Sequence, residues 1–432
     1  MRRSSGWRWR RTRARIARSI WIIPAVYVVA SLSLAVLIVN WDSSSPLELP
    51  LSLSSSSAST ALAALGSGMI AFTGFVTSVV LLVVQFGSSQ FSPRFLRWFR
   101  DDRTIKHSLG TFFATFLFAL VATALTGRGA DDVVPYRALL AALVLAIASI
   151  GWFLALISHT SNNLRVAHVA QRVDAQARTA FDAVYPTSHT QVQAARDAEE
   201  AFDRSSPVQE LRRAEVGEIL VAVDRAALLR LAVDHDVVIE LVSAVGDHIA
   251  TGGLILRVYG ERPVPERRFR AGLVFGDERT IEDDPAFAIR LLVDVAIKAL
   301  SPAVNDPTTA VQSIHRIEDV LLYASAKHLS MGVVTDEQNR ARVIIPTPSW
   351  SDLVALSLDE IRTSGAGQYQ IARRLRALLN DLITELPAER APALEDQLRL
   401  LTDAVEATFS EVQRVDALVA DRQGLGLARD DR

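Results

Sequence analysis

Cysteine is absent from this chain of 432 residues. Disulfides, thiolate nucleophiles, iron–sulfur clusters and cysteine-bound zinc are therefore excluded. Lysine is nearly absent, because it supplies only Lys106, Lys298 and Lys327 among 46 basic residues. The eight histidines show no spacing typical of a metal site. We also find no nucleophile–base pair and no phosphate-binding loop, so the sequence indicates no catalytic residues and no enzyme.

Charge is missing from four long stretches of the chain, half of which is hydrophobic. Each stretch covers the roughly 20 residues that a helix needs to cross the hydrocarbon of a bilayer. The sequence therefore predicts an α-helical integral membrane protein with four transmembrane helices. The four predicted spans are Ile20–Val39, Ala61–Phe86, Ser108–Thr126 and Ala138–Ile157.

Basic residues predict the orientation of these spans. Eight arginines precede the first span, none lies between Asn40 and Thr60, and five basic residues lie between Gly87 and His107. Because cytoplasmic loops are rich in Lys and Arg, both termini are predicted to be cytoplasmic, in a bacterial inner membrane. The basic clusters thus indicate topology and contact with lipid, not binding of nucleic acid.

Composition divides the chain into five predicted parts. A basic N-terminus is followed by the transmembrane domain, a helical stalk with a linker, an α+β cytoplasmic domain and a helical C-terminal region. Their predicted bounds are 1–19, 20–157, 158–213, 214–350 and 351–432.

Short runs with strand periodicity alternate with turns in the cytoplasmic region. Predicted strands cover Glu218–Val223, Val237–Ser243, Leu254–Tyr259 and Arg270–Phe275, and a predicted hairpin joins Met331–Thr335 to Arg342–Ile345. Asp224 is predicted to cap a helix after the first of these strands. The predicted C-terminal helices are Asp352–Arg362, Gln368–Leu386 and Leu394–Val419.

The second span is more polar than its neighbours, and it also contains three glycines. Thr73, Thr77 and Gln85 are spaced so that they share one helical face. Two interpretations fit this face, namely packing against another helix and the lining of a pore. No acid, base or histidine lies within the predicted spans, which argues against a proton-coupled carrier.

An amphipathic helix is predicted directly after this span, where Ser92-Pro93 is a typical start. Its aromatic residues occupy one side and its arginines the other, as in helices that lie in the membrane interface. It is an anchor on the membrane surface, or a collar that raises the anion concentration at a pore mouth. The arginines of this interfacial collar are Arg94, Arg97, Arg100 and Arg103.

Two Asp-Pro pairs stand out in the cytoplasmic region. Asp284-Pro285 and Asp306-Pro307 each place an N-cap carboxylate before proline at the first helical position. An alternative is that nearby polar groups converge on a pocket for a ligand or a divalent cation such as magnesium or calcium, although the spacing matches no EF-hand. The residues of this predicted pocket are Glu282, Asp283, Asn305, Asp306, Thr308 and Thr309.

The same region carries a resemblance. The runs Glu278-Arg279-Thr280…Asp284-Pro285-Ala286-Phe287 and Ser301-Pro302-Ala303-Val304-Asn305-Asp306-Pro307 resemble an uncharacterised bacterial family of membrane proteins, domain of unknown function 2254. Gln85-Phe86-Gly87-Ser88-Ser89-Gln90-Phe91-Ser92-Pro93-Arg94 is similar to that family's exit from the membrane. The resemblance implies a membrane architecture and carries over no activity.

Two functions therefore compete. The first is an oligomeric channel or conductance-type protein, a homo-oligomer whose second span lines the path and whose cytoplasmic domain regulates it. The second is a membrane-anchored sensory or scaffold module that binds a ligand or a protein through its cytoplasmic domain. In both, lipid is the expected partner, no cofactor is expected beyond the divalent cation considered above, and the small ligand or ion is open.

Overall fold

The structure is a computed structural model. It describes residues 21–45, 47, 54–90, 102–126, 134–163, 166–185, 197–198, 200, 202, 204, 206–329 and 332–427, with no side-chain detail for 86–90 and 161–163. The chain divides into two compact units, Met1–Arg165 and Val166–Arg432, here called the N-terminal and C-terminal units. Each unit has its own core.

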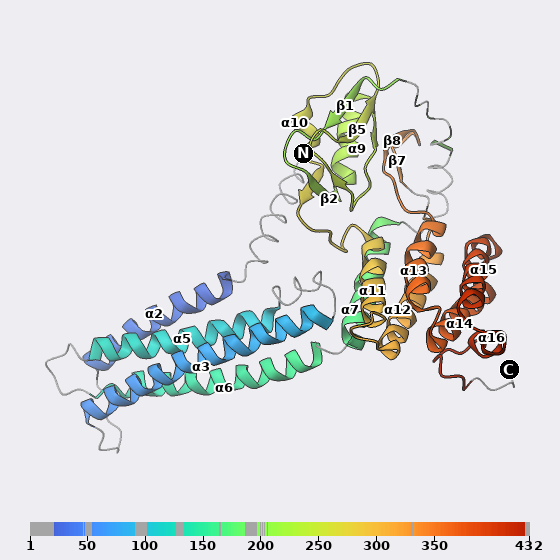
Figure 1. Ribbon diagram of the computed structural model, residues 1–432. Helices are drawn as coiled ribbons and strands as arrows, with labels where there is room; N and C mark the ends of the chain where they lie inside the picture. Colours follow the sequence, from blue (N-terminus) through green and yellow to red (C-terminus); the bar gives the residue numbers. More distant parts are fainter. Residues whose placement is uncertain are drawn as a thin grey trace. The chain divides into compact units, whose positions relative to one another are not determined.

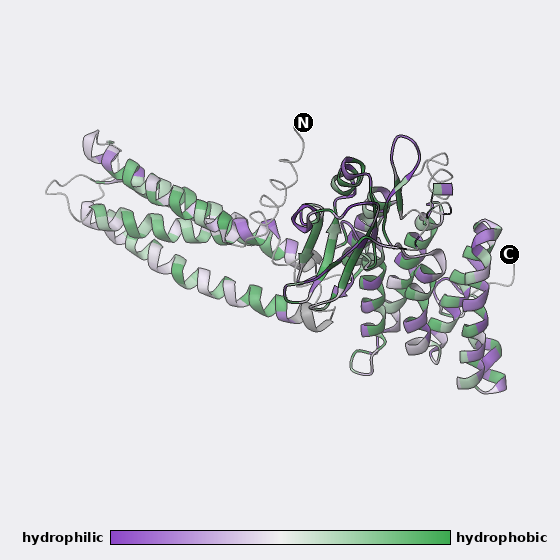
Figure 2. Cartoon of the chain, turned by 90° about the horizontal axis from the view of Figure 1, so that it is seen from above, coloured by the Kyte–Doolittle hydropathy of each residue, from purple (hydrophilic) through white to green (hydrophobic). Residues whose placement is uncertain are grey.

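The N-terminal unit contains four long apolar helices that run side by side (Figure 1). All four are long and apolar enough to cross a bilayer, which confirms the predicted fold class. In Figure 2 the ribbons of these four helices are coloured mostly from white to green, the hydrophobic end of the scale, whereas hydrophilic and hydrophobic residues alternate on the helices of the C-terminal unit. The four helices are α2 (Ile22–Ser44), α3 (Ser55–Gln90), α5 (Arg103–Thr126) and α6 (Tyr136–Asn163).

Helix α5 packs against the other three helices of this unit. Phe112 and Phe118 of α5 are fully buried. The ring of Phe72 on α3 contacts the rings of Phe112 and Phe153 edge to face, with centroids 5.3 and 5.0 Å apart. Thr115 and Ser149 share a hydrogen bond of 2.9 Å between their hydroxyls, which joins α5 to α6. Such bonds between spans satisfy polar groups that lipid cannot solvate.

Asp42 joins the last turn of α2 to the start of α6. Its carboxylate accepts hydrogen bonds from the backbone N–H of Arg137 at 3.3 Å and of Ala138 at 3.0 Å. The guanidinium of Arg137 pairs with the same carboxylate and stacks over the ring of Trp41. Because the first amides of a helix have no partner within it, Asp42 caps α6 from another helix.

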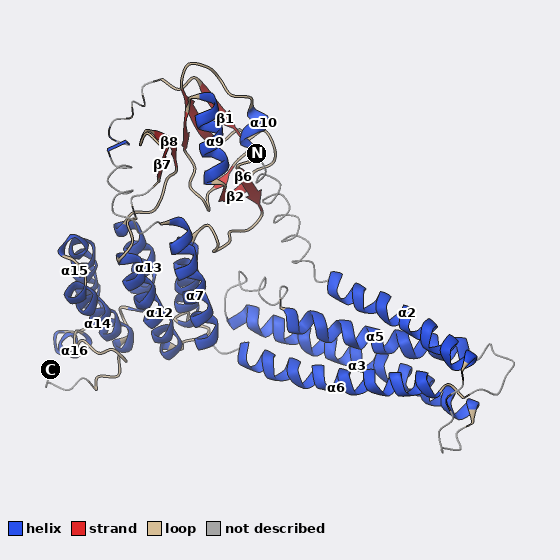
Figure 3. Cartoon of the chain, turned by 180° about the vertical axis from the view of Figure 1, so that it is seen from behind, coloured by secondary structure: helices blue, strands red, loops and turns tan. Residues whose placement is uncertain are grey.

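The C-terminal unit combines two β-sheets with a bundle of helices (Figure 3). One sheet has five strands in the order β1-β5-β3-β8-β7, in which only the β3–β8 pair is parallel; the other has three antiparallel strands in the order β4-β2-β6. Leu220, Leu256, Val258 and Phe269 are central members of the core that the sheets share with α9. The strands are β1 (Gln209–Arg212), β2 (Glu218–Val223), β3 (Val238–Leu241), β4 (His248–Ile249), β5 (Leu254–Tyr259), β6 (Leu273–Gly276), β7 (Val333–Thr335) and β8 (Ala341–Ile344).

The helical part of this unit is built around α11, whose residues are almost all buried. Helices α7, α12 and α13 pack against it. The helices of the unit are α7 (Val166–Val184), α9 (Arg225–His235), α10 (Glu266–Phe269), α11 (Pro285–Ala299), α12 (Pro307–Ser325), α13 (Trp350–Gly365), α14 (Tyr369–Glu385), α15 (Ala391–Thr408) and α16 (Glu411–Ala417), with a 3-10 turn at Ala388–Arg390.

Three features of this unit differ from the predictions. The predicted stalk is not a free helix, because α7 buries Val173, Ala177 and Phe181 against α11 and α12. Strand β1 falls at the end of the part that was predicted as stalk and linker, 158–213. The predicted helix Leu394–Val419 is broken after Thr408, because Ser410 and Gln413 form a capping box that starts α16.

Candidate functional site

The second span, α3, was predicted to present Thr73, Thr77 and Gln85 on one face. The structure does not place them in one environment. Thr73 is buried and donates to the carbonyl of Met69 at 2.7 Å, Thr77 is half-buried and donates to the carbonyl of Thr73 at 2.7 Å, and Gln85 is exposed. Met69 and Val76 pack with Phe112 of α5 on the side of α3 that holds Thr73. This face is therefore occupied by contacts within the chain.

Another face of α3 is exposed and consists largely of small and polar residues. From Thr60 to Ser78 its members recur every three or four positions, and Gln85 follows two turns after Ser78, which keeps them on one side of the helix. A Cβ atom added at Gly74 would meet nothing within 4 Å. The hydroxyls of Ser67 and Ser78 donate to carbonyls one turn earlier, at 2.9 and 3.0 Å. We call this face the α3 stripe; it comprises Thr60, Ala64, Ser67, Ala71, Gly74, Ser78 and Gln85.

The exposed face of α6 provides a contrast within the same unit. It carries large aliphatic side chains, among them Leu143, Ile147, Ile150 and Leu154, each more than half exposed. Such a surface is what lipid tails solvate best. The α3 stripe has less of this character, although the exposed Leu81 lies on the same face between Ser78 and Gln85, and Ile70, Phe75 and Leu82 lie exposed on neighbouring positions of α3. The two helices therefore present chemically different surfaces.

The predicted arginine collar is described at one residue only. Arg103 is the first residue of α5 and is exposed, whereas Arg94, Arg97 and Arg100 lie outside the described residues. Asp102, just before α5, accepts from the backbone N–H of Thr104 at 2.8 Å and contacts Nε2 of His159 at 2.6 Å. The collar itself stays a prediction.

Both Asp-Pro pairs are helix caps. Asp284 accepts from the backbone N–H of Phe287 at 3.1 Å, and Asp306 accepts from the backbone N–H of Thr309 at 3.0 Å. The second carboxylate oxygen of Asp306 accepts from the hydroxyl of Thr309 at 2.6 Å. Asn305 has a φ of 48°. This left-handed conformation is one that asparagine tolerates better than most residues, so Asn305 suits the turn between α11 and α12.

The predicted pocket residues do not come together. Glu282 and Asp283 precede α11, whereas the backbone N–H of Asp306 bonds the carbonyl of Ala299 at the other end of that helix. A helix of 15 residues is about 22 Å long. Glu282 and Asp283 therefore cannot share a ligand with Asn305, Asp306, Thr308 and Thr309. Over the described ranges, no group of three or more His, Asp or Glu side chains is placed to hold a metal ion.

Charge is unusually costly at the start of α11. Burial and the neighbouring carboxylate of Glu282 raise the pKa of Asp283. Burial also raises the pKa of Asp284, although the guanidinium of Arg279, at 2.7 Å, opposes this. Gly246 lies against this ion pair, because a Cβ there would be 2.6 Å from Oδ2 of Asp284. The glycine turn thus lies directly against the Arg279–Asp284 pair, where a side chain at position 246 would not fit.

Comparison with known proteins gives the family. The model of the family described as "Predicted membrane protein (DUF2254)" matches residues 17–381. The chain belongs to this family. The matched range of the family includes all four spans and the sheets and ends within α14, so α15 and α16 lie beyond it.

Relatives of the chain occur in mycobacteria. It is 28% identical over 407 residues to "Uncharacterized protein Mb1321c" of Mycobacterium bovis and to "Uncharacterized protein Rv1290c" of Mycobacterium tuberculosis. Each alignment covers 91% of this chain and 77% of the relative. No solved structure matches the chain.

The α3 stripe was missed in the sequence because hydroxyl residues line both sides of α3. The spacing of Thr73 and Thr77 predicts a polar face, but Ser67 and Ser78 also carry hydroxyls and lie on another face. Only the packing of Phe112 against one side distinguishes the buried face from the exposed one.

Proposed function

We propose that this member of the family is a homo-oligomeric, conductance-type protein of the bacterial inner membrane. In this proposal the α3 stripes of several copies surround a common axis, and the C-terminal unit regulates the path. The observation that carries the proposal is the exposure of small and polar residues on a membrane-spanning helix.

The need for several copies follows from the packing of one chain. Four helices bury Phe112, Phe118 and Leu62 between them, so the proposal places the path between copies and not inside one chain. Cyclic assembly of identical chains would bring one stripe from each copy to the axis. Small residues such as Gly74 allow close approach of helices, and hydroxyls and Gln85 can hydrogen-bond across helices or to water.

The chemistry of the stripe limits what such a path would conduct. It contains no acidic, basic or histidine side chain, so the path would offer hydroxyl, amide and backbone oxygen groups only. A proton relay through it is not part of the proposal. With both termini in the cytoplasm, Arg103 and the predicted collar would lie at the inner mouth and favour anions there.

The second candidate is a membrane-anchored sensory or scaffold module. The burial of Thr73 within the chain favours it, because the threonines that suggested a pore already pack against α5. In this case the α3 stripe is a contact between copies that conducts nothing, and the C-terminal unit binds the ligand or protein.

Cysteine accessibility distinguishes the two, because the native chain has no cysteine to interfere. Ser78→Cys and, as a control on the aliphatic face of α6, Ala148→Cys would be reconstituted in liposomes. The conductance proposal expects ion flux that a methanethiosulfonate reagent blocks in Ser78→Cys and leaves unchanged in Ala148→Cys. If the reagent blocks flux in neither variant, α3 does not line the path.

Crosslinking of Ser67→Cys separates assembly from conduction. Disulfide-linked copies without flux under voltage, tension or osmotic gradient would favour the anchored module. Absence of both crosslinks and flux would refute the oligomeric channel.

A further inference from the structure

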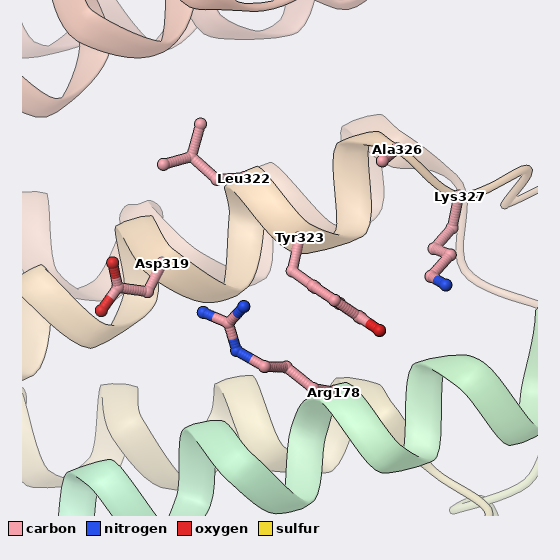
Figure 4. A pocket seen from close by; sticks show the side chains of 6 residues that line it. All are labelled: Arg178, Asp319, Leu322, Tyr323, Ala326 and Lys327. Carbon is pink, nitrogen blue, oxygen red and sulfur yellow. The ribbon is translucent and has the colours of Figure 1, made fainter.

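A cavity of about 420 Å³ that is open to solvent lies along the surface of α12 next to α7, both of which belong to the C-terminal unit (Figure 4). Its volume is within the range of about 300–1,000 Å³ that is common for sites of small molecules. Its lining combines an aromatic ring, two apolar side chains and charges of both signs. The lining residues are Arg178, Asp319, Leu322, Tyr323, Ala326 and Lys327.

Tyr323 is held in place at one end of this cavity. Its hydroxyl donates to Oδ1 of Asp182 at 2.6 Å, and Nζ of Lys327 donates to the same oxygen at 2.6 Å. Lys327 is more than nine-tenths buried, and its Nζ lies 4.9 Å from the centre of the Tyr323 ring. The hydrogen bonds from Lys327 and Tyr323 lower the pKa of Asp182, so its carboxylate is ionised and neutralises Lys327.

Arg178 extends over the other side of the same ring. Its Cζ is 4.9 Å from the ring centre, and its Nε donates to Oδ1 of Asp174 at 3.0 Å. Within the described part of the chain, its two terminal nitrogens have no hydrogen-bond partner. Figure 4 shows them directed toward α12, between Asp319 and Tyr323.

Two parallel N–H groups of a guanidinium match the two oxygens of a carboxylate or phosphate. Leu322 and Ala326 offer an apolar wall against which the body of a ligand can pack, whereas the faces of the Tyr323 ring are already covered by Arg178 and Lys327. Asp319 lies on the same helix, and its carboxylate is paired with Arg316 at 2.9 Å, which offsets its repulsion of an anion at Arg178. The cavity thus combines one anion-binding fork with one apolar wall.

We propose that this cavity binds a small organic anion, in which a single carboxylate or phosphate group is attached to a planar or apolar body. The anionic group bonds the terminal nitrogens of Arg178, and the body packs on Leu322 and Ala326. Such a ligand contacts α7 and α12 together. Because Val173, Ala177 and Phe181 already pack α7 against the bundle, the ligand adds a contact to an existing interface, whether or not the protein conducts.

Matched probes test the anionic group. Binding of AMP and benzoate to the full chain in detergent would be measured by titration calorimetry, beside adenosine and benzyl alcohol, which lack the anionic group. We expect both anions to bind about tenfold or more tightly than their neutral partners, the difference typical of charge-assisted hydrogen bonds. Binding of AMP alone assigns a phosphate ligand, and binding of benzoate alone assigns a carboxylate.

Substitutions test whether the anion binds in this cavity. Arg178→Gln is expected to weaken anion binding about tenfold or more, whereas Arg399→Gln, which removes an exposed arginine paired with Asp396 on α15, leaves it unchanged. Ala326→Trp fills the cavity without altering a charge and is expected to abolish binding with an unchanged melting temperature. The proposal is overturned if the wild type binds neither anion at millimolar concentration. Equal affinity for the neutral probes, or retained anion binding in folded Arg178→Gln or Ala326→Trp, refutes it as well.

Discussion

Removal of the cap at Asp306 should weaken the C-terminal unit by an amount that the local geometry sets. In Asp306→Ala, the backbone N–H and the hydroxyl of Thr309 both lose their acceptor. Loss of an N-cap costs about 0.5–2 kcal/mol, and the second hydrogen bond places the expected value near the upper end, about 2 kcal/mol.

Two companion variants separate the cap from the turn before it. Asp306→Asn keeps an oxygen for the N–H of Thr309 but loses the acceptor for its hydroxyl, so we expect a loss of about 0.5–1 kcal/mol. Asn305 has a φ of 48°, so Asn305→Ala should cost about 1–2 kcal/mol, because other L-residues are strained there. Asn305→Gly should be close to neutral, since glycine adopts this conformation freely.

The free energy of unfolding would be measured on the full chain in detergent, by urea titration followed by pulse proteolysis. The fragment that reports on α11 and α12 identifies the unit that unfolds. We expect stability to decrease from the wild type through Asn305→Gly to Asp306→Asn. The two alanine variants should be the least stable. An Asp306→Ala protein as stable as the wild type would refute the cap. A neutral Asn305→Ala would show that the left-handed turn is not what keeps asparagine at this position.

Three other predictions concern separate parts of the chain. Of two single cysteines, Ser54→Cys should react with an impermeant thiol reagent on intact cells while Ser206→Cys stays unlabelled; the reverse would overturn the topology. Burial would raise the pKa of Asp336, but hydrogen bonds from Arg340, Arg342 and the backbone of Gln338 outweigh it and lower this pKa from its usual 3.8 to about 2. The contribution of ionised Asp336 to the stability of the folded protein should therefore be complete above about pH 4 and disappear as the pH falls through 2. Asp336→Asn should abolish this part of the acid dependence of the melting temperature. Asp42→Ala should lower resistance to SDS unfolding by about 1–2 kcal/mol, because two amides of α6 lose their acceptor; an unchanged SDS titration would contradict this.

Local signals were sufficient for much of the fold. The charge-free stretches predict all four spans correctly. Burying a charge in lipid costs so much free energy that a long stretch without charge is by itself enough to predict a span. Strands β2 and β5 have the predicted bounds, since their apolar runs end at clear turns. Asp224 caps α9 as predicted, because capping depends only on residues within one turn.

The remaining features depend on contacts between distant segments. Strand β1 is polar along most of its length and exists because Leu211 pairs with Leu256 of β5. Likewise, α7 looks like a charged stalk until α11 and α12 cover its apolar side. The single pocket predicted around Asp283 and Asp306 failed for a simpler reason: both residues adjoin α11, and the length of that helix keeps them apart.

The contact between Asp42 and the start of α6 joins the first span to the last. Its partners are 95 and 96 residues later in the chain. A ribosome delivers the spans in order, so α2 reaches the bilayer well before the amides of α6 exist. Asp42 must keep its hydration until the fourth span has crossed, and the bundle closes only then. The contact between the first and fourth spans can therefore form only after all four spans have been synthesised.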